Sequence, residues 1–517
     1  MFLFAERMVN SLKNNIIRKL VFLIIFIVLL GKASDLRLHN LNEYSFWTDE
    51  IQTAIFSNAI VKTGSAKLAN GYTPGVYLPF WYYFPGASVT LFGQSNFSVR
   101  LPSVVFGIIT IFFVYFLGKA IFNNYVGLLA AVFTSFLKIE ILWSRQARPY
   151  QLLQLLAVLS LYFFIKALKE SGQKKVYFII FSFTFGFITF LSHPIGLSVI
   201  FSLLIYLLFF ERIKIKTNFK YYLFCIFAFI FFCVLLNNLF PEILNHFVKQ
   251  TFILKNNFYE VFPRITYYRI FFMKNYLSIL FIGFLGFLFS LKKHMRLMFP
   301  IILWALVHMG LIVFFQDQVY TRYAYPIFPV LIILFSFGLF RVSKMIALQR
   351  QYLQLLILSI LCLIILTGSD KFSLKKQEFY SLNDDMQEIP EVDYQKIYLN
   401  ISNKILFYPD TIYISNWNDH AVWYLGEGEL DYILRYNKNN LKKEPLSGAT
   451  YLTSLKDLVG VVQTHPKGII LLESWDNMIP QGVESYVQSN FNEEFKIDRL
   501  YPVQPRYWPV TVYSWGI

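Results

Sequence analysis

The sequence predicts a mainly α-helical protein that crosses a membrane with about eleven helices and ends in a separate α/β domain. Three observations carry this prediction. Of the 517 residues, 56% are hydrophobic and only 15% are charged, a composition that suits lipid better than water. Most apolar residues form unbroken runs of roughly 18 residues, long enough to cross a hydrocarbon core of about 30 Å. After residue 369, short β-rich runs replace these long apolar runs.

The apolar runs and the basic turns between them predict how the chain crosses the membrane. The expected spans are 17–33, 103–121, 126–143, 151–168, 176–192, 195–210, 221–240, 275–291, 297–315, 324–340 and 353–368. With the N-terminus inside, the basic turns at 166–175, 212–220, 292–296 and 341–350 all fall on the cytoplasmic side, where Lys and Arg accumulate. An odd number of spans places the tail outside. A cleaved signal peptide at 18–30 is the alternative, but no convincing small-residue cleavage site follows it.

Two domains follow from this reading. Residues 1–368 form the transmembrane domain, which includes a long first extracytoplasmic loop at 34–101. Residues 369–517 form an extracytoplasmic α/β domain. Strands are expected there at 396–401, 411–414, 468–472 and 510–513, and a helix is expected at 421–425 after the capping residues Asn418 and Asp419.

Charge and cysteines exclude several classes of function. The net charge is +16, but residues 369–517 hold 14 Lys and Arg against 20 Asp and Glu, so the basic excess belongs to the membrane part. Cytoplasmic turns and anionic lipid headgroups account for it without nucleic acid as a partner. All three cysteines, Cys225, Cys233 and Cys362, lie within expected spans, which indicates neither a disulfide framework nor a zinc site.

Asp49 and Glu50 are the only adjacent acids before residue 369. Aromatic and apolar neighbours would bury them in part near the membrane surface, and partial burial makes a carboxylate a better proton acceptor. We therefore take this pair as the candidate general base. The alternative is that Thr48 or Asp49 only caps a helix and Glu50 favours its positive end.

Four arginines precede expected spans on the same outer side: Arg100, Arg145, Arg148 and Arg322. Arginine can hold a phosphate through two parallel hydrogen bonds, as a lipid-linked phosphate requires. The alternative is that each arginine only reaches lipid phosphates beside an aromatic belt.

Three further residues are weaker candidates. His193 interrupts an apolar hairpin and either binds phosphate or metal or serves as a polar cap. Arg264 and Arg269 lie in the aromatic outer loop 241–274, which either contacts a polyprenyl chain or rests on the membrane as an amphipathic helix.

The order of several short motifs resembles a known family. An outer loop with the Asp49-Glu50 pair is followed by Tyr72-Thr73-Pro74-Gly75-Val76-Tyr77, by Leu91-Phe92-Gly93 and by Arg100-Leu101-Pro102-Ser103. The stretch from Arg145 to Tyr150, and Arg322-Tyr323 with Pro326 and Pro329, continue the likeness, which spans roughly residues 40 to 340. In this order the motifs resemble the membrane-embedded GT-C glycosyltransferases, in particular the polyprenyl-phosphate-mannose protein mannosyltransferases and the aminoarabinose transferases of lipid A.

The resemblance implies an enzyme with a GT-C type fold, an inverting glycosyltransferase in the bacterial inner membrane. It would move one sugar from a polyprenyl-phosphate donor to a lipid, glycan or protein acceptor at the outer face. Asp49, with Glu50 beside it, would be the catalytic base. The donor phosphate would be bound by Arg100, Arg145, Arg148, Tyr150, Arg322 and Tyr323, with His193, Arg264 and Arg269 as further candidates.

The chain departs from the family pattern in one respect that concerns metals. No acid occurs between Glu50 and Glu140, so a metal site on that loop is not expected, and no cofactor is predicted; a requirement for a divalent metal stays open. Two other functions also remain as alternatives. One is a transporter or flippase of lipid-linked sugars, which would more naturally place ionisable groups inside the spans. The other is a polymerase or ligase of lipid-linked oligosaccharides.

Overall fold

The computed structural model describes residues 15–74, 79–210, 261–316, 318–348, 350–376, 392–437, 441–474, 476, 478–497 and 509–517, with a few isolated positions between 211 and 260. The chain forms two compact units. The first comprises Met1–His39, Ser103–Arg145 and Pro149–Tyr380, and the second comprises Asn40–Pro102, Gln146–Arg148 and Ser381–Ile517. The chain therefore passes several times from one unit to the other.

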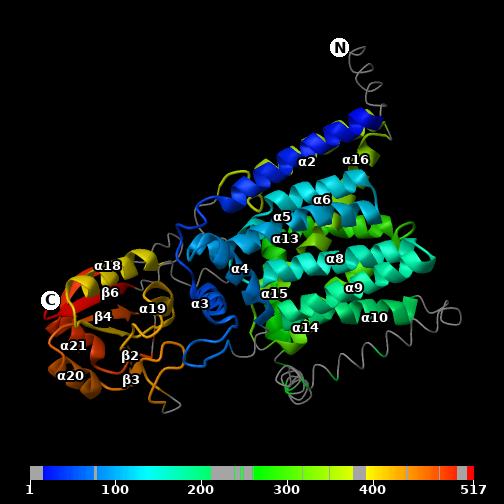
Figure 1. Cartoon of the computed structure of the whole chain (residues 1–517). Coiled ribbons are helices and arrows are strands. Elements are labelled where there is room, and N and C mark those ends of the chain that lie inside the picture. The colour runs from blue at the N-terminus through cyan, green and yellow to red at the C-terminus, as the bar shows by residue number, and fades with distance from the viewer. Residues whose placement is uncertain are drawn as a thin grey trace. The chain divides into compact units, whose positions relative to one another are not determined.

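The first unit consists of helices (Figure 1). They are α2 (Asn15–Leu38), most of α5 (Asn96–Ile121), α6 (Asn124–Phe136), α7 (Lys138–Ser144), α8 (Tyr150–Lys169), α9 (Gly172–Ser192), η2 (Pro194–Gly196), α10 (Leu197–Phe210), α13 (Val261–Ser290), α14 (Met295–Phe315), α15 (Thr321–Ala324), η5 (Tyr325–Ile327), α16 (Phe328–Ile346) and α17 (Gln351–Gly368). Among the described residues, seven helices are long and apolar enough to cross a membrane. The predicted spans in this part of the chain are largely helical, although some comprise more than one helix, whereas the span at 221–240 lies almost wholly outside the described residues.

One predicted span is interrupted. The run 126–143 forms two helices, α6 and α7, because Leu137 between them is extended, with φ −66° and ψ 123°. Two backbone hydrogen bonds hold this break, from Lys138 to the carbonyl of Lys371 and from Ser373 to the carbonyl of Phe136. A segment that is distant in sequence therefore fixes the break, and apolar periodicity alone does not reveal it.

Small residues allow α13 and α16 to pack closely. A Cβ atom on Gly286 would overlap the carbonyl oxygen of Leu334, and one on Gly338 would overlap the carbonyl oxygen of Ile282. Close approach of two backbones at small residues is the usual way in which apolar helices pack inside a membrane.

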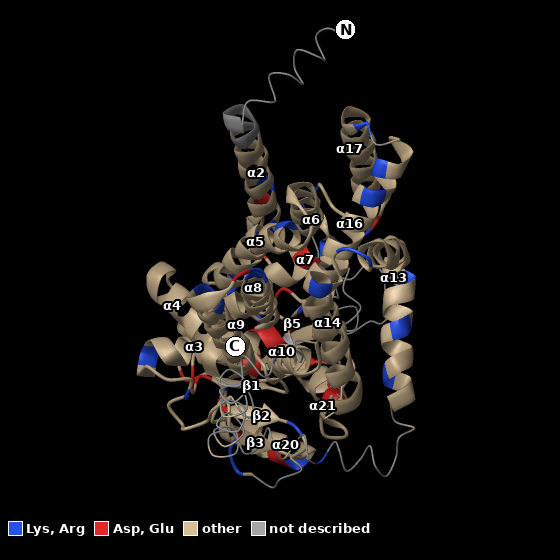
Figure 2. Cartoon of the chain, turned by 90° about the vertical axis from the view of Figure 1, so that its right-hand side faces the viewer, with Lys and Arg blue, Asp and Glu red and all other residues tan. Residues whose placement is uncertain are grey.

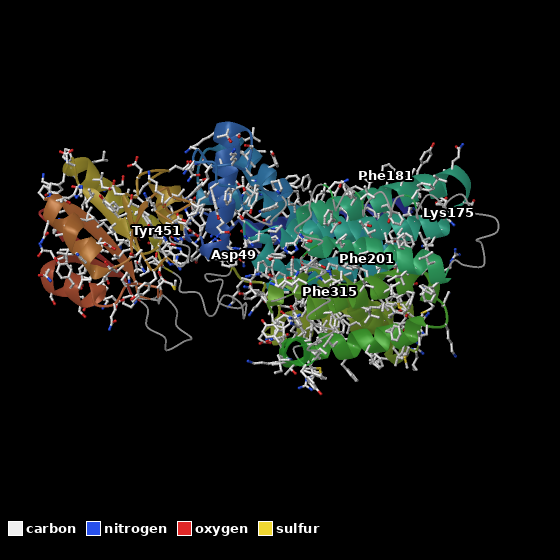
Figure 3. All side chains as sticks on the ribbon, turned by 90° about the horizontal axis from the view of Figure 1, so that it is seen from below. Asp49, Lys175, Phe181, Phe201, Phe315 and Tyr451 are labelled. Atoms are coloured by element: carbon white, nitrogen blue, oxygen red, sulfur yellow. The ribbon has the colours of Figure 1, made fainter. Side chains whose placement is uncertain are left out.

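The outer surface of this unit suits lipid. Phe181 lies on the surface-facing side of α9, where it is 49% exposed (Figure 3). Figure 2 shows long stretches of these helices free of charge, whereas α13 carries several cations, which are Arg264, Arg269 and Lys274. The predicted outer loop 241–274 is helical from Val261 onward, and α13 has a break at Tyr276.

The second unit combines the first loop with the C-terminal region. From the first loop it contains α3 (Thr48–Thr63), η1 (Pro79–Tyr82) and α4 (Tyr83–Phe92). From the C-terminal region it contains helices α18 (Tyr394–Phe407), α19 (Asp419–Tyr424), α20 (Leu455–Thr464) and α21 (Val483–Asn490), and strands β1 (Ile412–Ser415), β2 (Tyr432–Leu434), β3 (Thr450–Leu452), β4 (Gly468–Glu473), β5 (Asn492–Ile497) and β6 (Val510–Trp515).

The six strands form one sheet in the order β3-β2-β1-β4-β6-β5. The first four strands of that order are parallel, and β6 runs antiparallel to both β4 and β5. Side chains alternate between the two faces, so Ile469 and Leu471 pack with α18 while Ile470 and Leu472 pack with α20 and α21. The sheet thus lies between two layers of helices (Figure 1), an α/β arrangement as predicted.

One of the predicted strands is wrong. Residues 396–401 belong to helix α18, which begins where the Asp393 side chain accepts a hydrogen bond from the backbone N–H of Lys396. Its buried residues, Tyr394, Ile397, Tyr398 and Ile401, recur at helical spacing. The other three predicted strands are confirmed as β1, β4 and β6, and the predicted helix at 421–425 corresponds to α19.

Candidate active site

Asp49 lies in the first turn of α3, in the second unit (Figure 3). Its carboxylate is 28% exposed, and its Oδ2 lies 3.4 Å from Nη2 of Arg148. Arg148 also donates a hydrogen bond to the backbone carbonyl of Asp49 at 2.7 Å, and its guanidinium lies 6.0 Å from the centre of the Trp47 ring. The carboxylate thus lies at the N-terminal end of a helix and beside a cation. Arg148 therefore holds Asp49 in a position where the carboxylate is partly exposed.

Glu50 has entirely different surroundings from its neighbour Asp49. It forms a two-pronged ion pair with Arg100, whose Nε and Nη2 lie 3.0 and 2.7 Å from the two carboxylate oxygens. Both side chains are fully buried. The backbone N–H of Ala147 adds a further hydrogen bond to Glu50 at 2.7 Å. The bond from Ala147 connects α3 to the short segment that carries Arg148.

Arg100 uses its remaining donors on backbone carbonyls. Its Nη1 donates to the carbonyls of Leu41 and Tyr44, and its Nη2 donates to that of Ser45. Its guanidinium also lies 4.8 Å from the centre of the Phe46 ring. Arg100 therefore shapes the backbone that leads into α3.

Arg145 belongs to the first unit, although it is only three residues from Arg148. It is buried, and its Nη1 donates to the carbonyl of Leu36 at 3.0 Å.

Four of the predicted site residues come together in the first unit. The rings of Tyr150, His193 and Tyr323 form a cluster, with centres 5.4 Å apart for Tyr150 and His193 and 6.1 Å apart for each of the other two pairs. The Arg322 guanidinium lies 3.8 Å from the centre of the Tyr320 ring and 5.6 Å from that of Tyr323. A buried cation among tyrosines is a suitable arrangement for holding a phosphate.

His193 and Arg264 also have local contacts that stabilise the fold. The His193 ring accepts a hydrogen bond from the N–H of Ile195 and so caps η2. Arg264 is buried and donates to the carbonyls of Val313 and Phe314 in the last turn of α14, a favourable position for a cation. Arg269 is exposed on α13.

The first unit contains a buried polar network that was not predicted from the sequence. The Tyr325 hydroxyl lies 2.9 Å from Glu140, which also accepts from Gln154. His308 bonds through Nε2 to the carbonyl of Tyr323 at 2.7 Å. Polar residues inside apolar runs are the signal that could have revealed these contacts. They fix the carbonyl of Tyr323 and the side chain of Tyr325, which follow Arg322 in the chain.

Two buried titratable residues of the second unit were also missed. Burial, with Glu444 and Glu473 nearby, raises the pKa of Asp419 to about 7. Burial lowers the pKa of His420 to about 4. Both lie at the start of α19, where Asp419 was predicted only as a helix cap.

The described residues contain no candidate metal site. Within the described residues, no three His, Cys, Asp or Glu side chains are grouped so that they could hold a metal ion.

Known proteins resemble this chain in both sequence and structure. The family model for dolichyl-phosphate-mannose-protein mannosyltransferases matches residues 74–236. No curated protein sequence matches the chain. Among solved structures, ArnT from Cupriavidus metallidurans in the apo state is 13% identical, with a TM-score of 0.60 over 96% of this chain and 97% of ArnT. The same protein bound to undecaprenyl phosphate gives a TM-score of 0.64 at 13% identity, over 95% of this chain and 98% of ArnT.

A third similar structure is the oligosaccharyltransferase of Archaeoglobus fulgidus in complex with zinc and sulfate. It is 14% identical, with a TM-score of 0.51 over 86% of this chain and 67% of the archaeal chain. The chain has the GT-C fold. The predicted fold class and the resemblance to GT-C glycosyltransferases are thus confirmed. Together with its apolar helices, the GT-C fold makes this chain an integral membrane protein.

Proposed function

We propose that this GT-C protein is an inverting glycosyltransferase that moves one sugar from a polyprenyl-phosphate donor to a hydroxyl or phosphate of a lipid, glycan or protein acceptor. The reaction takes place at the outer face of a bacterial inner membrane. The observation that carries the proposal is the contrast at the start of α3: Asp49 is partly exposed and held by Arg148, whereas Glu50 is fully buried against Arg100.

Asp49 acts as the general base. Its carboxylate takes the proton of an acceptor hydroxyl as the acceptor oxygen attacks the anomeric carbon of the sugar. The bond from that carbon to the phosphate oxygen breaks, and the polyprenyl phosphate leaves with the electron pair. One displacement inverts the anomeric configuration and needs one base. This assignment agrees with the exposure of Asp49, since a base must touch the acceptor.

Arg322, with Tyr150, His193 and Tyr323 around it, is our candidate for holding the donor phosphate. The support is chemical: a buried guanidinium offers a phosphate two parallel hydrogen bonds. The solved ArnT complex contains undecaprenyl phosphate, a lipid phosphate of the proposed donor class.

For Glu50 and Arg100 we propose a positioning role in place of the catalytic and phosphate-binding roles that the sequence suggested. Both side chains are fully buried, and each oxygen of Glu50 already accepts from Arg100. Breaking such a pair leaves an unpaired buried charge and destabilises the fold.

The test compares Asp49→Asn with Glu50→Gln in purified, reconstituted protein supplied with a polyprenyl-phosphate sugar. Asp49→Asn keeps the shape of the side chain but removes the proton acceptor, so the transfer rate should fall by roughly 10² to 10⁴ with unchanged thermal stability. Glu50→Gln should lower the thermal stability as well as the rate. Wild-type transfer by Asp49→Asn at equal protein level would reduce Asp49 to a helix-terminal residue and overturn the proposal.

A further inference from the structure

The backbone just before Asp49 is held from two parts of the second unit. Arg100 binds the carbonyls of Tyr44 and Ser45 at 2.7 and 3.1 Å. The next carbonyl along the chain, that of Phe46, accepts a hydrogen bond from Nε2 of His420 at 2.9 Å. His420 lies on α19, more than 370 residues away in sequence. Three consecutive carbonyls are therefore fixed by side chains.

The C-terminal region makes further contacts with the same segment. The Phe46 ring is buried between Arg100 and Trp423, whose ring centre lies 5.7 Å away at an interplanar angle of 70°. The backbone N–H of Gln395 donates to the hydroxyl of Ser45 at 3.1 Å. Helices α18 and α19 thus contact the backbone, hydroxyl and ring of two neighbouring residues.

His420 is built to hold one geometry. It is 2% exposed, and its ring stacks on Tyr394 with 3.5 Å between ring centres and 15° between planes. Burial keeps its pKa at about 4, so the ring is neutral at pH 7. Its bond to a carbonyl oxygen requires the neutral tautomer with the proton on Nε2.

The position of Phe46 determines how α3 begins. The carbonyl of Trp47, the next residue, accepts the first hydrogen bond of the helix, from the N–H of Ile51 at 3.0 Å. Asp49 follows two residues after Trp47, in the first turn. A shift of the Phe46 carbonyl therefore turns the first turn of α3 and moves the carboxylate of Asp49.

We propose that His420 is a positioning residue for Asp49: the C-terminal domain fixes the Phe46 carbonyl and thereby orients the carboxylate that acts as base. This inference rests on the proposed function and deepens it, because it assigns the C-terminal domain a part in the transfer step. Misplacement of a reacting group by about 1 Å costs up to roughly 10²-fold in rate. Loss of one hydrogen bond should produce a smaller effect.

The test uses two variants of His420 and one control in the full-length protein. His420→Phe keeps a ring to stack on Tyr394 but has no N–H for the Phe46 carbonyl. His420→Gln keeps an N–H donor at similar reach. The control is Tyr413→Phe, which removes a buried hydroxyl bonded to Tyr398 in the same domain, away from the segment before α3.

We expect kcat to fall about tenfold in His420→Phe with the donor KM unchanged, and His420→Gln to recover most of the loss. Tyr413→Phe should keep the wild-type kcat. Deuterium uptake by the amides of residues 44–51 should rise in His420→Phe only. A wild-type kcat in His420→Phe, an equal loss in Tyr413→Phe, no recovery in His420→Gln, or unchanged deuterium uptake would each overturn the inference.

Failure of the proposed function looks different from failure of this inference. If wild-type protein transfers no sugar, or if Asp49→Asn is fully active, the proposed function fails whatever His420 does. If Asp49→Asn is inactive while His420→Phe matches wild type, the function stands and only the positioning role of His420 is lost.

Discussion

Asp49 and Glu50 differ because neighbouring positions of a helix point about 100° apart. One side chain of the pair reaches solvent and Arg148, and the other points into the unit against Arg100. The sequence could show that two adjacent acids begin a helix among aromatic residues. It could not show which acid is buried, because the partner Arg100 is 50 residues away.

At the residue scale, Arg148 and Arg322 should respond differently to lysine. Arg148→Lys keeps the charge but cannot hold both the carbonyl and the carboxylate of Asp49, so we expect kcat to fall about tenfold. Arg322→Lys loses the planar fork for phosphate, so we expect the donor KM to rise by roughly 10 to 100-fold. The measurement is transfer rate against donor concentration.

Arg269→Lys is the matched control for these two variants, because Arg269 is exposed on α13. It should keep wild-type kinetics. Wild-type kinetics in all three variants would mean that Arg148 and Arg322 serve only in structure or in lipid contact.

At the scale of elements, the start of α19 carries two buried groups with opposite pH behaviour. Asp419 has a raised pKa in the folded state, so its contribution to stability falls as pH rises from about 4 to about 7. His420 has a lowered pKa, so its contribution rises between about pH 4 and 6.5. In the wild type, the falling contribution of Asp419 and the rising contribution of His420 oppose each other between about pH 4 and 6.5.

Single substitutions should separate the two trends. Relative to wild type, the Tm of Asp419→Asn should rise as pH increases from 5 to 7.5, because the variant has no buried acid to ionise. The Tm of His420→Gln, relative to wild type, should rise as pH decreases from 6.5 to 4.5, because no buried imidazole must take up a proton. Thermal unfolding of the detergent-solubilised protein at four pH values measures both; parallel curves for all three proteins would refute this account of α19.

The contact between α13 and α16 gives another prediction at this scale. Gly286→Ala places a Cβ against the carbonyl of Leu334, so we expect a loss of about 1–3 kcal/mol in stability from overpacking. Gly310→Ala on α14 is the control, because a Cβ there meets no heavy atom within 4 Å. Thermal unfolding should show a clear loss for the first variant and none for the second. Equal Tm values would mean that the helices are not closely packed at Gly286.

Elements formed by long apolar runs could be predicted from sequence. Elements whose conformation depends on distant partners could not. The membrane helices follow directly from long apolar runs. Residues 396–401 have strand-like composition, yet a cap at Asp393 and burial at helical spacing make them helical. Leu137 breaks its helix because residues 371–373 bond to its neighbours.

For the whole molecule, the sequence predicted a membrane region followed by a C-terminal domain. The structure shows that residues 40–102 and 146–148 form one compact unit with residues 381–517. This grouping depends on contacts such as that of His420 with Phe46. No local sequence pattern links two residues so far apart in the chain. Residue type and position predicted the candidate site residues, whereas His420, which holds the backbone before Asp49, was not predicted.

Topology is the prediction at this scale. Single cysteines at Lys62 and Thr450, both exposed in the second unit, should react with an impermeant maleimide from outside the cell. A cysteine at the exposed Lys174, in a predicted cytoplasmic turn, should react only after permeabilisation. Labelling of positions 62 and 450 from opposite sides would refute the predicted orientation.

Sugar transfer by Asp49 is the central claim, and mass spectrometry of glycolipids and glycoproteins tests it most directly. The comparison is between cells that make wild-type protein and cells that make Asp49→Asn at the same level. We predict that at least one lipid or protein species carries one additional sugar residue in wild-type cells and lacks it in Asp49→Asn cells. Identical spectra from the two, with both proteins present in the membrane, would contradict the claim.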